Sequence, residues 1–203
     1  LEGVLTGIVD AHVQHWNPRR TPWAATRASR LYGFVPTLGD RVFPLVVSRA
    51  DREYILTPRT VARAYEPRQY ATDAALVPTV VGVPIDTVVH VESHWRREVA
   101  DAAEPPVDST AVEETRYLES LPFGQAGTPR LGAVISHGDP RTRTFATMLD
   151  EQFAASPRFR GIRIVASRHP DPRVRDGGDT DNLLSSTAFL EGFAELASRD
   201  LVF

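Results

Sequence analysis

One stretch of the chain reads Leu131-Gly132-Ala133-Val134-Ile135-Ser136-His137-Gly138-Asp139-Pro140, an apolar run of strand length that ends in polar residues. Its apolar half predicts a buried strand, and the Asp-Pro pair at its end suits the N-cap and first turn of a helix. Phe145, Leu149 and Phe153 follow on one face of that helix. A buried strand that leads into an amphipathic helix is the repeating unit of a parallel α/β sheet.

The same unit recurs on both sides of this stretch. Further apolar runs of strand length lie at 4–9, 87–91, 160–165 and 201–203. Thr110 and Glu113 form a capping-box pattern that opens a helix extending to about Leu121. Asp181 is the predicted cap of the last helix. The chain therefore alternates between strands and helices over most of its length.

Four strand–helix units and the start of a fifth strand amount to about half of a (β/α)8 barrel. We therefore predict an α/β fold of the TIM-barrel class, in which residues 1–203 are the N-terminal part of a single barrel domain. Either a longer protein or a second chain would complete that barrel, and a self-contained five-stranded open sheet is the alternative. The segment from about 16 to 85 is rich in proline and arginine and too long for an ordinary connection. We expect a long loop insertion there, with a short helix at 57–65.

The composition excludes several kinds of chemistry. All 23 basic residues are arginine and the chain has no cysteine, so lysine Schiff bases, disulfides and thiolate ligands are impossible within it. A net charge of -3 gives no electrostatic reason to expect nucleic-acid binding. The sequence has neither a long apolar span nor the pattern of a signal peptide, so we predict a cytoplasmic protein that does not bind membranes.

A group of polar residues ends the first predicted strand, which continues Asp10-Ala11-His12-Val13-Gln14-His15. Side chains alternate along a strand, so His12 and Gln14 are expected to point the same way and His15 to point aside. A His-x-His pair would offer two imidazoles to one metal ion at this place. A glutamine carbonyl is a weak ligand for zinc. By spacing alone, His12 is either a metal ligand or a structural histidine.

Several motifs follow one another along the chain: Gly7-Ile8-Val9-Asp10-Ala11-His12-Val13-Gln14-His15-Trp16-Asn17-Pro18, Val88-Val89-His90-Val91-Glu92, Leu131-Gly132-Ala133-Val134-Ile135, Phe159-Arg160-Gly161-Ile162-Arg163, and Leu190-Glu191-Gly192-Phe193 through Leu201-Val202-Phe203. Together they resemble the amidohydrolase-2 family, the TIM-barrel metal-dependent hydrolases. The first strand of that family typically reads I-D-x-H-x-H-x-W-D-P, and its fourth carries F-R-G-V-R. The resemblance is closest to the lactonase-like branch of the family.

This resemblance implies a hydrolase in which water attacks a lactone or a related carboxylated small molecule. The water would be activated either by a divalent metal ion, for which zinc is the expected element, or by a carboxylate base. His12 matches the first metal-ligand histidine of the family, and Gln14 stands where the second is expected. Arg163 matches a position from which an arginine could hold a substrate carboxylate. The family's later histidines and its general base would lie beyond Phe203.

Two further candidates lie at predicted strand ends. Glu92 follows the second strand, where it could contact metal or substrate, or simply pair with Arg96. His137 ends the third strand and could reach the same site. Two other functions fit the same sequence: a decarboxylase of the same superfamily, and a non-catalytic half-barrel subunit completed by another chain or by a second copy.

Overall fold

A computed structural model describes residues 6–22, 32–47, 52, 57–93, 95, 107–171, 173–174 and 177–203. Within these residues, four strands form one sheet in the order β1-β2-β3-β4, and every neighbouring pair is parallel. The strands are β1 (Ile8–Val13), β2 (Ile85–Val91), β3 (Arg130–His137) and β4 (Phe159–Arg163). The predicted parallel α/β architecture is therefore confirmed.

The strand boundaries differ from the predicted ones mainly at the start of the chain. The sequence predicts the first strand at 4–9, whereas β1 begins at Ile8 and continues to Val13; part of the predicted range lies outside the described residues. His12 consequently belongs to the strand itself. β1 pairs with β2 through a register shift between Asp10 and Val13, where β1 has one residue more than its partner. Such a β-bulge changes the direction of the side chains beyond it.

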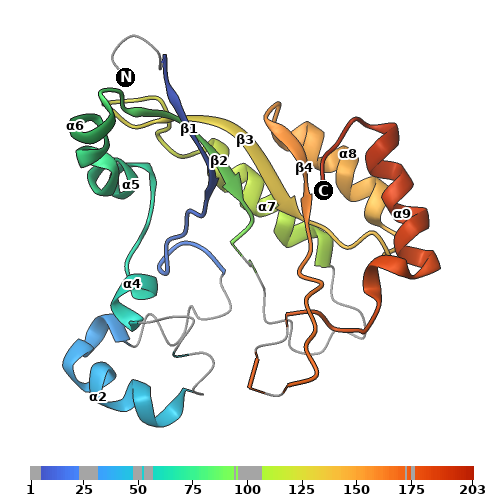
Figure 1. The fold of residues 1–203 in the computed structure, drawn as a ribbon, viewed down its shortest axis with the longest axis horizontal. Helices are drawn as coiled ribbons and strands as arrows, with labels where there is room; N and C mark the ends of the chain where they lie inside the picture. Colours follow the sequence, from blue (N-terminus) through green and yellow to red (C-terminus); the bar gives the residue numbers. More distant parts are fainter. Residues whose placement is uncertain are drawn as a thin grey trace.

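Helices pack against one face of the sheet and form its core. α7 (Val107–Glu119) lies on β3, α8 (Phe145–Ala155) packs beside α7, and α9 (Thr187–Ser198) packs beside α8 (Figure 1). The largest buried cluster joins these helices to β4 and consists of Val112, Phe145, Met148, Leu149, Phe159, Ile162 and Leu196. Removal of this apolar surface from water is the main source of stability. This buried cluster holds in place the strands whose ends carry the candidate site.

The segment predicted as a long loop with one short helix at 57–65 contains that helix and several others. These are α2 (Pro36–Val46), α4 (Pro58–Ala62), α5 (Pro67–Asp73), the 3-10 helix η1 (Ala74–Leu76) and α6 (Val77–Val81). α5 and α6 lie near the β1 side of the sheet, whereas α2 and α4 lie away from it (Figure 1). Tyr70 of α5 packs on Val13 and Val88, so this segment also contributes to the core.

The closed barrel is not what the structure shows. β1 and β4 are the two ends of an open sheet, and β1 pairs with β2 alone among the described strands. The fifth apolar run does lie beside β4, because Val202 forms a parallel bridge with Gly161. A small open parallel sheet is compatible with several α/β folds. The TIM-barrel prediction is therefore wrong for this chain.

Three predicted helix caps are also wrong. Thr110, the predicted cap of its helix, lies inside α7. α8 begins at Phe145 after Thr144, and Asp139 instead binds the backbone N–H and the guanidinium of Arg141. The last helix begins after the short 3-10 helix η2 (Leu183–Ser185), and the Ser186 hydroxyl accepts the N–H of Phe189. Asp and Ser have similar capping preferences, so local sequence does not decide between them.

No helix within the described residues is both long enough and apolar enough to cross a membrane.

Candidate functional site

Two cavities lie near the carboxyl ends of the strands. The first, which we call the β1 pocket, has a volume of about 280 Å³. Its lining consists of Asp10, His12, Val13, Gln14, Trp16, Tyr65 and Tyr70. The second, the β4 pocket, has a volume of about 330 Å³. Its lining consists of Ile135, Ile162, Arg163, Ile164, Val202 and Phe203.

Polar groups of the β1 pocket come from the bulged end of β1. Asp10 Oδ1 accepts the backbone N–H of His12 at 3.1 Å, a local hydrogen bond two residues along the chain. Asp10 Oδ2 accepts the hydroxyl of Tyr70 at 2.8 Å. His12 is exposed, and Gln14 is half-buried. The pocket therefore brings a carboxylate, an imidazole and an amide together at one strand end.

Aromatic rings form the remaining wall of the β1 pocket. Trp16 stacks on Tyr65 with 5.3 Å between ring centroids, and Trp16 and Tyr65 also exchange backbone hydrogen bonds. Tyr65 and Tyr70 meet edge to face at 6.4 Å. Burial raises the pKa of Tyr65 to about 12, and burial together with the Asp10 hydrogen bond raises that of Tyr70 further. Both phenols are thus neutral donors at physiological pH.

A fully buried carboxylate connects three of the predicted site residues. The Glu92 side chain has no exposed surface and binds the guanidinium of Arg163 through Nη2 and, at 2.8 Å, through Nε. The backbone carbonyl of Glu92 accepts hydrogen bonds from Gln14 Nε2 at 2.7 Å and from Arg163 Nη2 at 3.3 Å. Gln14, Glu92 and Arg163 therefore form one connected group across the end of the sheet. Arg96, the pairing alternative for Glu92, lies outside the described residues.

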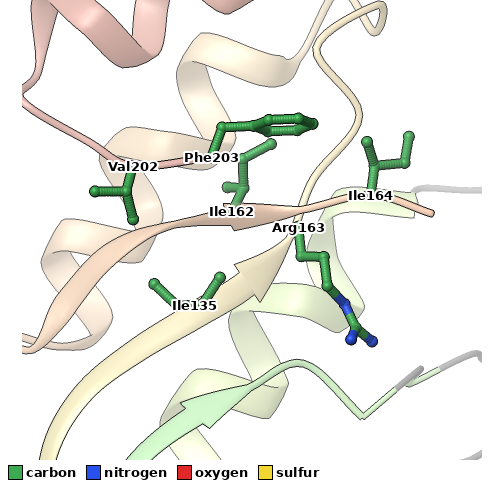
Figure 2. Close-up of a pocket in the computed structure, with 6 residues that line it drawn as sticks. All are labelled: Ile135, Ile162, Arg163, Ile164, Val202 and Phe203. Carbon is green, nitrogen blue, oxygen red and sulfur yellow. The ribbon is translucent and has the colours of Figure 1, made fainter. Parts of the chain in front are cut away.

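The β4 pocket is apolar apart from Arg163. In Figure 2 the guanidinium of Arg163 points away from Val202 and Phe203, and its partner is the carboxylate at the end of β2. The aliphatic part of the Arg163 side chain contributes to the pocket wall, whereas its guanidinium binds Glu92. This cavity therefore has no charged group directed into it among the described residues.

The remaining predicted site residues lie on different strands. His137, half-buried, is the register partner of Arg163 across β3 and β4. His12 lines the β1 pocket at the other edge of the sheet and is not among the residues that line the Arg163 cavity. The structure thus brings Gln14, Glu92 and Arg163 together and gives His12 a cavity shared with Gln14.

A divalent metal ion does not find a complete set of ligands at His12. In the part of the chain that the structure describes, no three His, Cys, Asp or Glu side chains are grouped so that they could hold a metal ion. Structural and catalytic zinc sites use at least three protein ligands. The described residues therefore do not fit the zinc ion that the sequence resemblance implies, and we derive no step through a metal.

A buried polar cluster lies beside the site and was not expected from the sequence. His15 and His90 are both fully buried, with ring centroids 5.9 Å apart. Glu114 Oε1 accepts from His90 Nε2 at 2.9 Å, Ser93 N at 2.8 Å and Ser93 Oγ at 2.7 Å. Burial, followed by the charge of His90, lowers the pKa of His15 to about 3. The sequence offers one signal for this cluster, which is the place of Glu114 on the apolar side of its amphipathic helix.

Searches for similar proteins found no match to a protein-family model, a curated protein or a solved structure. The likeness to the amidohydrolase-2 family therefore rests on the short motifs quoted above.

Proposed function

We propose that this chain is a hydrolase that opens a lactone or a related small ester, with the reaction taking place in the β1 pocket. The observation that carries this proposal is the grouping of Asp10, His12 and Gln14 around one small cavity at the carboxyl end of β1. Active sites of parallel α/β proteins lie at this edge of the sheet. The motif resemblance to the lactonase-like branch supports the same reaction class.

In this proposal His12 is the general base. Its imidazole takes a proton from the attacking water as the water oxygen bonds to the lactone carbonyl carbon. The ring C–O bond then breaks, and the departing alkoxide oxygen receives the proton that His12 accepted. The product is a hydroxy acid, and one water is consumed. The Tyr70 hydroxyl, which stays protonated, lies on the same pocket and donates to Asp10.

Arg163 and Glu92 have a positioning role in this proposal. The guanidinium of Arg163 is bound to a buried carboxylate of the protein itself, so a substrate carboxylate would have to displace Glu92. The carbonyl of Glu92 holds the amide of Gln14, which lines the reaction pocket. The pair therefore fixes one wall of the pocket through Gln14.

A proton-release assay tests this function on a panel of five- and six-membered lactones, because each hydrolysis produces an acid. We expect His12→Gln to lower kcat by at least about 100-fold, the usual size of a general-base contribution. The matched control is His169→Gln, since His169 is exposed in a loop. Equal rates for wild type and His12→Gln across the panel would refute the proposal. Lack of any hydrolysis by the wild type would favour the non-catalytic alternative.

A further inference from the structure

The β1 pocket carries an unusual balance of charge for an arginine-rich chain. Asp10 is its carboxylate, and no arginine is among the described residues that line it. The chain has 23 basic residues, all arginine, so their absence from this lining distinguishes the pocket from the Glu92–Arg163 group. A carboxylate in a partly enclosed cavity attracts cationic ligands and repels anionic ones.

The aromatic rings add a second reason to expect a cation. Trp16 and Tyr65 are nearly parallel, at 27°, and Tyr65 and Tyr70 are nearly perpendicular, at 76°. All three rings line the cavity that Asp10 lines. The faces of Trp and Tyr rings attract organic cations, and a carboxylate beside them supplies the counter-charge.

The position of the Asp10 carboxylate is fixed before any ligand binds. Its two oxygens accept one hydrogen bond each from His12 N and Tyr70 Oη. A carboxylate offers about four acceptor positions, so these bonds orient it and leave capacity for a ligand N–H. The same aromatic group already takes one cation, because the Arg63 guanidinium lies 5.7 Å from the centroid of the Tyr65 ring. Arg63 is itself paired with Asp73 outside the pocket lining.

We propose that the β1 pocket binds a small organic ammonium group, held by the Asp10 carboxylate and the rings of Trp16, Tyr65 and Tyr70. The inference rests on the proposed function, where it identifies the substrate as a lactone or small ester that carries a positively charged nitrogen near its carbonyl. His12 lines the same cavity.

Calorimetric titration with choline and with its neutral isostere 3,3-dimethylbutan-1-ol tests this inference without any hydrolysis. Both titrations are run at the same pH, about 8. We expect choline to bind at least about tenfold more tightly than the isostere, in line with cation–π and charge contributions of this size. Equal affinities, or no binding of choline at millimolar concentrations, would overturn the inference.

Matched variants assign the binding to the pocket. Asp10→Asn and Trp16→Leu should each weaken choline binding about tenfold. Asp86→Asn removes a carboxylate that pairs with Arg130 on the surface and should leave the affinity unchanged. Choline binding that is equal in Asp10→Asn and wild type would also overturn the inference.

The two proposals fail separately. Selective choline binding with no lactone hydrolysis would refute the hydrolase and leave the ammonium site standing. Hydrolysis that depends on His12, with no preference for choline over its isostere, would refute the ammonium site alone.

Discussion

Glu92 at the end of β2 and Arg163 at the end of β4 form an ion pair that spans β3, with the carboxylate fully buried and the guanidinium side chain 28% exposed. Arg163 donates to both the side chain and the backbone carbonyl of Glu92. The pair thus ties two non-adjacent strands together at the edge where the candidate site lies.

Arg163→Met should destabilise the protein by about 3 kcal/mol, because it leaves the Glu92 carboxylate buried without its partner. Glu92→Gln should cost less, since the remaining guanidinium reaches solvent. The double variant should recover part of the loss of Arg163→Met. Urea unfolding of all four proteins measures these differences, and strictly additive losses would contradict the coupling.

Acid should destabilise the protein through His15. Its pKa is about 3 in the folded state against 6.5 for the free side chain, because burial disfavours the charged imidazole. The unfolded chain therefore binds the proton first. The stability contribution is complete above pH 6.5 and falls by up to about 1.4 kcal/mol per pH unit as the pH drops toward 3.

Urea unfolding between pH 7 and pH 4 measures this effect. Substitution of His15 by Gln removes the titrating group, so the difference in unfolding free energy between wild type and variant should shrink on acidification. His169→Gln, in an exposed loop, should follow the wild type at each pH. A constant difference between wild type and His15→Gln would contradict the assignment to His15.

Glu114 should be a strong determinant of stability. Its Oε1 atom accepts three buried hydrogen bonds, from His90 and from two atoms of Ser93. Glu114→Leu should cost at least about 3 kcal/mol, because these donors lose their acceptor away from water. Glu114→Gln keeps one oxygen acceptor and should cost less. Chemical denaturation compares the two, and equal losses would show that the hydrogen bonds are not the cause.

Gly161 should tolerate no side chain. A Cβ atom there would lie 2.2 Å from the backbone oxygen of Val202, in the bridge that holds the last residues against β4. Gly161→Ala should therefore destabilise the protein by about 1–3 kcal/mol through overpacking. Gly33→Ala is the control, because no atom lies within 4 Å of its added Cβ. Thermal unfolding should show a lower midpoint for Gly161→Ala only.

The sequence predicted the strands of the sheet better than the chain between them. The runs at 87–91 and 131–135 lie within β2 and β3, because apolar β-branched runs bounded by polar residues are local signals. The segment from 16 to 85 is predicted as a loop with one short helix at 57–65, and α4 (Pro58–Ala62) lies in that range. The helices that begin at Pro36 and Pro67 were missed. Proline suits the first turn of a helix as well as a loop, so a proline-rich composition does not separate the two.

The candidate site also has a part that local sequence predicted and a part that it did not. Alternation along β1 gave His12 and Gln14 a common direction, and both line the β1 pocket. Tyr65 and Tyr70 complete that pocket from more than fifty residues away, and no local pattern links them to Asp10. The same holds for Glu92 and Arg163, which the sequence marked as separate candidates.

The sequence by itself determined the strands of the parallel sheet, the helices that follow β2, β3 and β4, and the absence of lysine and cysteine chemistry, because periodicity and composition act through neighbours along the chain. Only the tertiary structure decided that the sheet stays open, that Glu92 neutralises Arg163, and that His15 is buried against His90. These features depend on which distant segments share one side of the sheet, and packing and desolvation fix that choice across the whole chain.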